Sequence, residues 1–190
     1  MHTLEPYYNW RGLYAAEEDP FSPFFQREYS EFEYSKKIYN YYIHPQWDDF
    51  GSQTLFLKIL YTSYEEGYAI LELIGEWNDL LYNDIMFLKR EVAECIMQHG
   101  IYKFILIGEN VLNYHGQDDS YYAEWYEELE DNNGWLAMVN LQPHVLEDIG
   151  QTGLDSYMVL GGNLNEFNWR TMHPHQFFQM VQHYVVKRLA

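Results

Sequence analysis

The sequence predicts a small α/β domain built on a mixed sheet, with an aromatic N-terminal arm and an extra C-terminal helix. From residue 54 onward, apolar runs of strand length alternate with stretches whose apolar residues recur at helical spacing. The first two strand-like runs are separated by turn residues alone, which predicts an antiparallel hairpin. The later alternation predicts parallel strands joined by right-handed crossovers. We therefore expect an arm over residues 1–53 and an α/β domain over residues 54–190.

Residues 1–53 differ from the rest of the chain because they are rich in tyrosine and phenylalanine and follow no sustained period. One stretch, Lys36–Ile43, is rich in β-forming residues and can form a strand. We expect the arm to cover an edge or a helix of its own domain. The alternative is a homodimer or heteromer contact through the arm, because tyrosine and tryptophan are enriched in interface cores.

The hairpin is expected from two strand-like runs, Thr54–Tyr61 and Tyr68–Gly75, with turn residues between them at Tyr64–Gly67. A helix follows over Asn83–His99, where apolar residues recur at three- and four-residue intervals. Gly100 fits the position just after this helix, where a left-handed residue commonly ends it.

Two later apolar runs are short and lack polar alternation, as in strands that are covered on both faces. Each is followed by an amphipathic stretch, and one of these begins with a proline at its first turn and ends at a glycine. The remaining elements are expected as strand Tyr102–Ile107, helix Ser120–Asp131, strand Trp135–Val139, a helix from Pro143 to Gly153, strand Tyr157–Leu160 and helix His173–Leu189.

The formal net charge of −18 limits the partners of this protein. A strongly negative field repels phosphate backbones and anionic lipid, so we expect neither nucleic acid nor a membrane surface as a partner. The single cysteine, Cys95, excludes an internal disulfide and a cysteine-based zinc site. The start of the chain lacks the pattern of a signal peptide, and no apolar run is long enough to span a membrane. These features predict a soluble cytoplasmic protein.

Two local patterns resemble the STAS domain family, which includes bacterial anti-sigma-factor antagonists. One is the segment Asn133–Val145 with Leu146, in which a glycine, an apolar strand, a small polar residue and a proline precede a short helix. That helix ends in Thr152–Leu154, as family members often end it in Gly-Leu. The other is Leu73–Trp77, an apolar-Gly-Glu run after the second strand. The resemblance covers roughly Leu55 to Leu160 and implies the STAS fold.

In signalling members of that family, a serine at the start of the helix after the third strand is phosphorylated by a kinase partner. Here the corresponding loop is Glu109–Ser120, and an ungapped alignment places Gly116 or Gln117 at the serine position. Neither can be phosphorylated. Ser120 aligns only with an insertion, and Asp118 and Asp119 before it are more simply a helix N-cap cluster. The resemblance implies that this loop and the next helix form a docking surface, with the residues Asn113, His115, Gly116, Gln117, Asp118, Asp119, Ser120, Tyr121, Glu124 and Glu128.

No known catalytic signature is present, and we expect no cofactor and no metal site. His115 has two aspartates nearby in sequence, which allows acid–base chemistry or a divalent ion, but no third ligand is evident. We therefore predict a non-enzymatic protein–protein interaction module in intracellular signalling, similar to an anti-sigma-factor antagonist without the usual serine. Its expected partner is a basic or kinase-like protein. The alternatives are a binder or sensor of a small apolar molecule, and an enzyme that uses His115.

Overall fold

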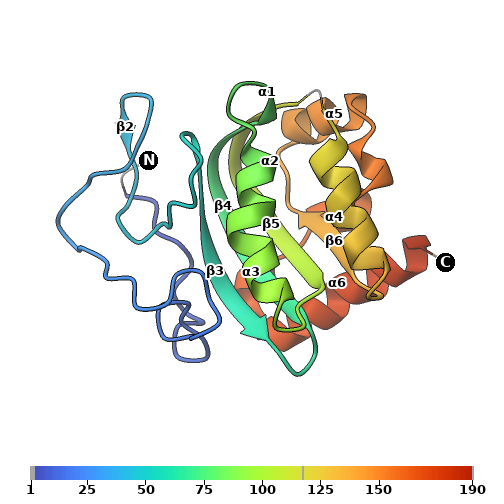
Figure 1. Cartoon of the computed structure of the whole chain (residues 1–190), viewed down its shortest axis with the longest axis horizontal. Helices are drawn as coiled ribbons and strands as arrows, with labels where there is room; N and C mark the ends of the chain where they lie inside the picture. Colours follow the sequence, from blue (N-terminus) through green and yellow to red (C-terminus); the bar gives the residue numbers. More distant parts are fainter. Residues whose placement is uncertain (1–2, 117, 190) are drawn as a thin grey trace.

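The structure of the chain is a computed structural model that describes residues 3–116 and 118–189. Its centre is a four-stranded sheet in the order β3-β4-β5-β6 (Figure 1). The strands are β3 (Leu55–Ser63), β4 (Tyr68–Asn78), β5 (Lys103–His115) and β6 (Trp135–Val139). The β3–β4 pair is antiparallel, whereas β4–β5 and β5–β6 are parallel. The mixed sheet with its N-terminal hairpin is therefore confirmed.

Helices cover both faces of this sheet (Figure 1). On one face, the front face, lie α4, α5 and a continuous helical stretch made of α2, the π-helical turn η1 and α3; on the other, the back face, lies α6. The helical elements are α1 (Asp79–Tyr82), α2 (Asp84–Phe87), η1 (Leu88–Ala93), α3 (Glu94–Met97), α4 (Ser120–Glu130), α5 (Pro143–Gln151), α6 (Pro174–Leu189) and the 3-10 turns Leu154–Ser156, Gly162–Asn165 and Trp169–Thr171.

Strand β4 is buried along its whole length. Successive side chains of a strand point to opposite faces, so Ala69, Leu71 and Leu73 enter the front core while Tyr68 and Ile70 enter the back core. The ring of Tyr68 stacks on Phe178 of α6, with their centroids 3.8 Å apart. Because both faces are covered, the sequence of β4 reads as a nearly continuous apolar run.

Several expected elements differ from the structure. Strand β5 does not end at Ile107 but continues to His115, because β4 also continues to Asn78 and pairs with it. Most of the loop expected over Glu109–Ser120 is therefore strand. The strand expected over Tyr157–Leu160 reduces to a single parallel bridge between Val159 and Ala137. The helix expected over Asn83–His99 is present as one stretch from Asp84 to Met97, but its middle, Leu88–Ala93, is π-helical instead of α-helical.

The N-terminal arm packs on its own sheet. A short hairpin, β1 (Lys37–Ile38) and β2 (Tyr41–Tyr42), replaces the single strand expected there. A third cluster of buried residues joins the arm to the back of the sheet through Ile38, Ile43, Trp47, Phe56 and Ile74. Asp48 also bridges to Leu57 and so covers part of the exposed edge of β3.

A buried carboxylate in β4, that of Glu72, connects both ends of the chain. Its side chain accepts a hydrogen bond from the backbone N–H of Tyr7, at 2.8 Å, and lies 3.5 Å from the guanidinium of Arg170. Arg170 also pairs with Glu109. Burial raises the pKa of Glu72 to about 7; the Tyr7 N–H and Arg170 oppose the shift, and Glu109 adds to it. The arm and the segment before α6 are thus attached to one strand by the same group.

No helix among residues 3–116 and 118–189 has both the length and the apolar character that a bilayer crossing requires.

The raised pKa of Glu72 makes stability depend on pH. Between the usual value of 4.5 and about 7, the folded chain holds a proton that the unfolded chain releases, so the free energy of unfolding falls as pH rises. The full change is roughly 3 kcal/mol. We expect Glu72→Gln to flatten the change between pH 6 and 7.5, measured by urea unfolding, whereas below pH 6 other buried carboxyls with raised pKa values contribute as well. Glu147→Gln, on the exposed side of α5, is the control; equal slopes for Glu72→Gln and wild type would contradict the assignment.

Candidate functional site

The residues expected to form a docking surface gather at the edge of the sheet where β4 and β5 end. Asn78 of β4 pairs with His115 of β5, so both strands stop at the same level. Helix α1, the loop after β5 and α5 lie together at this end of the molecule (Figure 1). We call α1, residues 113–116 and residues 118–121 the carboxyl-edge surface.

Asp79 fixes α1 at this edge. Its carboxylate accepts hydrogen bonds from Trp77 Nε1 at 2.9 Å, from the N–H of Ile85 at 2.7 Å and from the Tyr122 hydroxyl. Burial raises the pKa of Asp79 to about 6, and these three hydrogen bonds oppose the shift. Since the donors come from β4, α2 and α4, one carboxylate holds three elements in place.

Two leucines of α1 remain in water as a result. Leu80 is 58% exposed and Leu81 is 70% exposed. The turn cannot rotate to bury them, because the N–H of Leu81 donates to the capping side chain of Asn78 at 2.9 Å while Asp79 holds the other side. Exposed apolar side chains beside polar ones are typical of surfaces that bind another protein.

Asn113 and His115 lie in β5 rather than in a loop. His115 is about half exposed, and its Nε2 lies 3.6 Å from a carboxylate oxygen of Glu76. The other oxygen of Glu76 accepts a hydrogen bond from the hydroxyl of Tyr39 in the arm, at 2.7 Å. Gly116 abuts the Tyr114 hydroxyl so closely that a side chain there would collide with it. Gln117 lies outside the described residues.

The aspartates before α4 are engaged with the chain. Asp118 accepts a hydrogen bond from the N–H of Ser120 at 2.8 Å, and this bond lowers its pKa. Asp119 is the residue that precedes the helix, but its side chain accepts from the Tyr157 hydroxyl at 2.8 Å instead of capping. The predicted cap cluster is therefore present in a different form, and Ser120 is the exposed first residue of α4.

Glu124 and Glu128 of α4 face a buried lysine. The ammonium of Lys89 lies 2.7 Å from Glu94, 3.1 Å from Glu124 and 2.9 Å from Glu128, and its side chain is fully buried. Arg90 pairs with Glu94 and Glu124 as well, and its guanidinium lies 5.8 Å from the ring of Tyr121. The two carboxylates expected in a docking helix are thus largely neutralised by cations of the same chain.

This arrangement supplies little chemistry of its own. The only hydroxyl that the structure records as hydrogen-bonded to the side chains of the His115–Glu76 pair, among the described residues, is that of Tyr39, which donates to Glu76 and not to the imidazole. Over the same part of the chain, only Glu94, Glu124 and Glu128 bring three carboxylates close enough to hold a metal ion, and Lys89 occupies the space between them.

A groove of about 230 Å³ lies at the other edge of the sheet, beside β6. Buried apolar side chains contribute to its lining, among them Trp135, Leu136 and Met158. The rings of Tyr126 and Tyr157 also border it, with centroids 6.0 Å apart. Its size exceeds that of one or two water molecules, so a ligand of one or two rings fits.

Comparison with known proteins gives a similarity of fold. No protein-family model matches the chain, and no curated protein matches it. Among solved structures, TM1081 of Thermotoga maritima, assigned as an anti-sigma factor antagonist, is 14% identical with a TM-score of 0.39 and covers 50% of this chain and 80% of its own. The anti-sigma factor antagonist SpoIIAA in its unphosphorylated form is 17% identical, with a TM-score of 0.42 and coverage of 56% and 89%.

An NMR structure of TM1081 is 18% identical, with a TM-score of 0.37 and coverage of 47% and 73%. These proteins are of the class to which the sequence resemblance pointed. The strand order and strand directions of the sheet agree with the STAS-like fold that the sequence predicts.

Sequence reasoning overlooked the groups that hold this site together. Lys89 stands four residues after Ile85 and three before Val92, on the apolar stripe of its helix. A lysine on such a stripe is a recognisable signal of a buried ion pair. Asp79, directly after an apolar strand and an asparagine, carried only the weak signal of a helix start.

The buried ammonium can be tested by removal. Lys89→Met leaves three carboxylates within 4.8 Å of one another without a central cation, so we expect a loss of roughly 2 kcal/mol in the free energy of unfolding. Adding Glu128→Gln to Lys89→Met should recover part of that loss by relieving the repulsion. Urea unfolding at pH 7 measures both. A double variant no more stable than Lys89→Met would show that repulsion is not the cause.

Proposed function

We propose that this protein is a non-enzymatic protein–protein interaction module and that the carboxyl-edge surface is its docking face. The observation that carries the proposal is the rigid display of Leu80 and Leu81 beside the polar loop. When a partner covers apolar side chains that the fold keeps exposed, their burial lowers the free energy of the complex. Because Asp79 fixes their orientation, little conformational entropy is lost on binding.

The charge of the chain favours a basic partner. With a net charge of −18, the protein attracts cationic surfaces within the Debye screening length of the solution. Asp118 and Asp119 are exposed at the docking face, so they can contact basic side chains while the leucines are covered. A kinase-like regulator is the partner class that the anti-sigma-factor antagonists suggest. Signalling by this chain would then not depend on a serine at position 116 or 117.

The docking face is tested by charge reversal. We expect the variant with both Asp118→Lys and Asp119→Lys to retain at least tenfold less of a partner that the wild type binds, because both the long-range attraction and the direct contacts are removed. Affinity capture with quantitative mass spectrometry measures this. Glu65→Lys with Asp131→Lys, at the opposite end of the sheet, changes the net charge equally and should retain the partner.

Leu81→Asp provides a second variant at the same face, since it removes apolar contact without touching the loop. Equal retention of every captured protein by the wild type, the Asp118/Asp119 variant and Leu81→Asp would overturn the docking face.

The groove beside β6 supports a second candidate function, the binding of a small apolar molecule. Its volume of about 230 Å³ and its border of aromatic rings match a flat single- or double-ring compound. This function needs no contact at the carboxyl-edge surface, so the two candidates can be tested separately.

Indole is a suitable probe of the groove. We expect a Kd of about 2 mM, from roughly 0.4 kcal/mol for each of its non-hydrogen atoms, and a shift of the Trp135 indole N–H signal in NMR titration. Ser156→Trp should abolish the shift by filling the groove, whereas Ser35→Trp, in the arm, should leave it. If indole shifted the Trp135 signal equally in the wild type and in Ser156→Trp, indole would bind somewhere other than this groove.

A further inference from the structure

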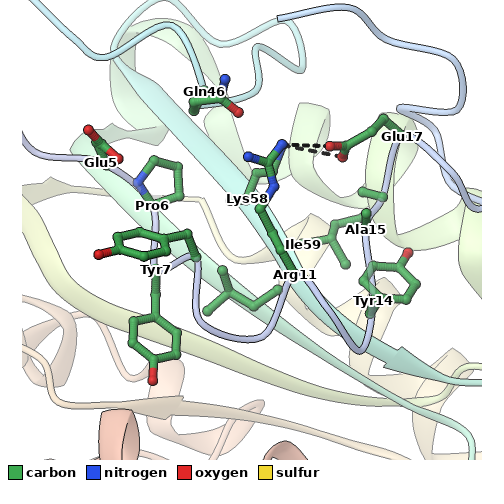
Figure 2. Close-up of a pocket in the computed structure, with 13 residues that line it drawn as sticks. Glu5, Pro6, Tyr7, Arg11, Tyr14, Ala15, Glu17, Gln46, Lys58 and Ile59 are labelled. Atoms are coloured by element: carbon green, nitrogen blue, oxygen red, sulfur yellow. Dashed lines mark hydrogen bonds and ion pairs between the residues drawn. The ribbon is translucent and has the colours of Figure 1, made fainter. Parts of the chain in front are cut away.

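A small pocket lies between the N-terminal arm and β3 (Figure 2). The arm contributes residues 5–8, 11, 14–17 and 46, and β3 contributes Lys58, Ile59 and Leu60. Its volume is about 30 Å³. The pocket is therefore a seam between two parts of the chain that are distant in sequence.

Polar atoms with no hydrogen-bond partner gather at this seam. Among the described residues, Lys58 Nζ, Glu17 Oε2 and Gln46 Oε1 are buried and have no such partner, and all three residues line the pocket. The side chain of Lys58 is only 8% exposed. Its ammonium lies 3.7 Å from Glu17 Oε2 and 3.3 Å from Asp48 Oδ2, and also 3.7 Å from the centre of the Tyr29 ring.

Leaving such atoms unpaired is costly, at about 1–3 kcal/mol for each buried polar group. The distance from Lys58 to Glu17 is too long for a direct hydrogen bond, and a separation of this size is one that a bridging molecule can close. Burial lowers the pKa of Lys58, while Asp48 and Glu17 oppose that shift by attraction. The ammonium thus gains from any additional acceptor.

Charge and size identify the class of molecule. Lys58 and Arg11 are cationic, and the two carboxylates beside Lys58, those of Glu17 and Asp48, balance them. Arg11 donates to Glu17 Oε1 at 2.7 Å (Figure 2). This balance favours neither a metal cation nor an anion. The bound group must accept from an ammonium and donate to a carboxylate and an amide oxygen. A volume of about 30 Å³ admits one or two water molecules and nothing larger.

We propose that this pocket is a binding site for an ordered water molecule that accepts a hydrogen bond from Lys58 and donates to Glu17 and Gln46. The water joins the arm to the edge strand of the sheet. It adds to the apolar contacts of Ile38 and Trp47, which attach the arm to the same face of the sheet. The water molecule is then a structural part of the contact between the arm and the sheet.

The proposal is tested by whether one substitution, Gln46→Met, lowers or raises the stability of the protein. If the water is bound, Gln46→Met deletes one of its acceptors, and the equilibrium constant for unfolding rises about fivefold. If Gln46 Oε1 is unpaired in the folded protein, the same change removes a buried polar atom and that constant falls. Gln176→Met, at an exposed position of α6, is the matched control. No change or a fall, relative to that control, overturns the proposal.

A crystal structure of the full chain at about 1.5 Å provides the second measurement. We expect a density peak roughly 2.7–3.2 Å from both Lys58 Nζ and Glu17 Oε2. A direct contact between these two atoms, with no peak between them, would overturn the proposal whatever the stability data show.

Discussion

Burial of β4 on both faces is the constraint on which the rest of the structure depends. All of its residues are buried, from Tyr68 to Asn78. A strand in that position needs cover from helices on the front and from other segments on the back. The α2–α3 stretch, α4 and α5 provide the first, while α6, the segment before it and the N-terminal arm share the second. The arm is thus part of the cover of this sheet.

The side chains on the back of β4, apolar and polar in turn, decide where each covering segment attaches. Tyr68 and Ile70 pack in one cluster with α6, and Glu72 then binds Tyr7 and Arg170. Further along, Ile74 packs with the hairpin of the arm, and Glu76 accepts from its turn. Because a buried polar group must find hydrogen-bond partners, the two carboxyl groups act as fixed points between apolar zones.

Most of the fold could be predicted from the sequence because periodicity reports burial, and burial is what the sheet and its helices have in common. Pairing partners were harder to predict. The polar stretch at the end of β5 resembles a loop, and only its pairing with an equally long β4 makes it strand. Ionic contacts such as those of Lys89 with α4 join residues more than 30 positions apart, so the local pattern can signal a buried cation but cannot identify its partners. The exposure of Leu80 and Leu81 likewise depends on hydrogen bonds made by Asp79 to distant elements.

One carboxylate connects the arm to the carboxyl-edge surface. Glu76 accepts from Tyr39 with one oxygen and faces His115 with the other. A ligand that displaced the imidazole, or that placed a cation beside Glu76, would compete with the Tyr39 hydroxyl for the same carboxylate. If such a ligand altered the strength of that hydrogen bond by some factor, breaking the bond would alter the affinity of the ligand by the same factor.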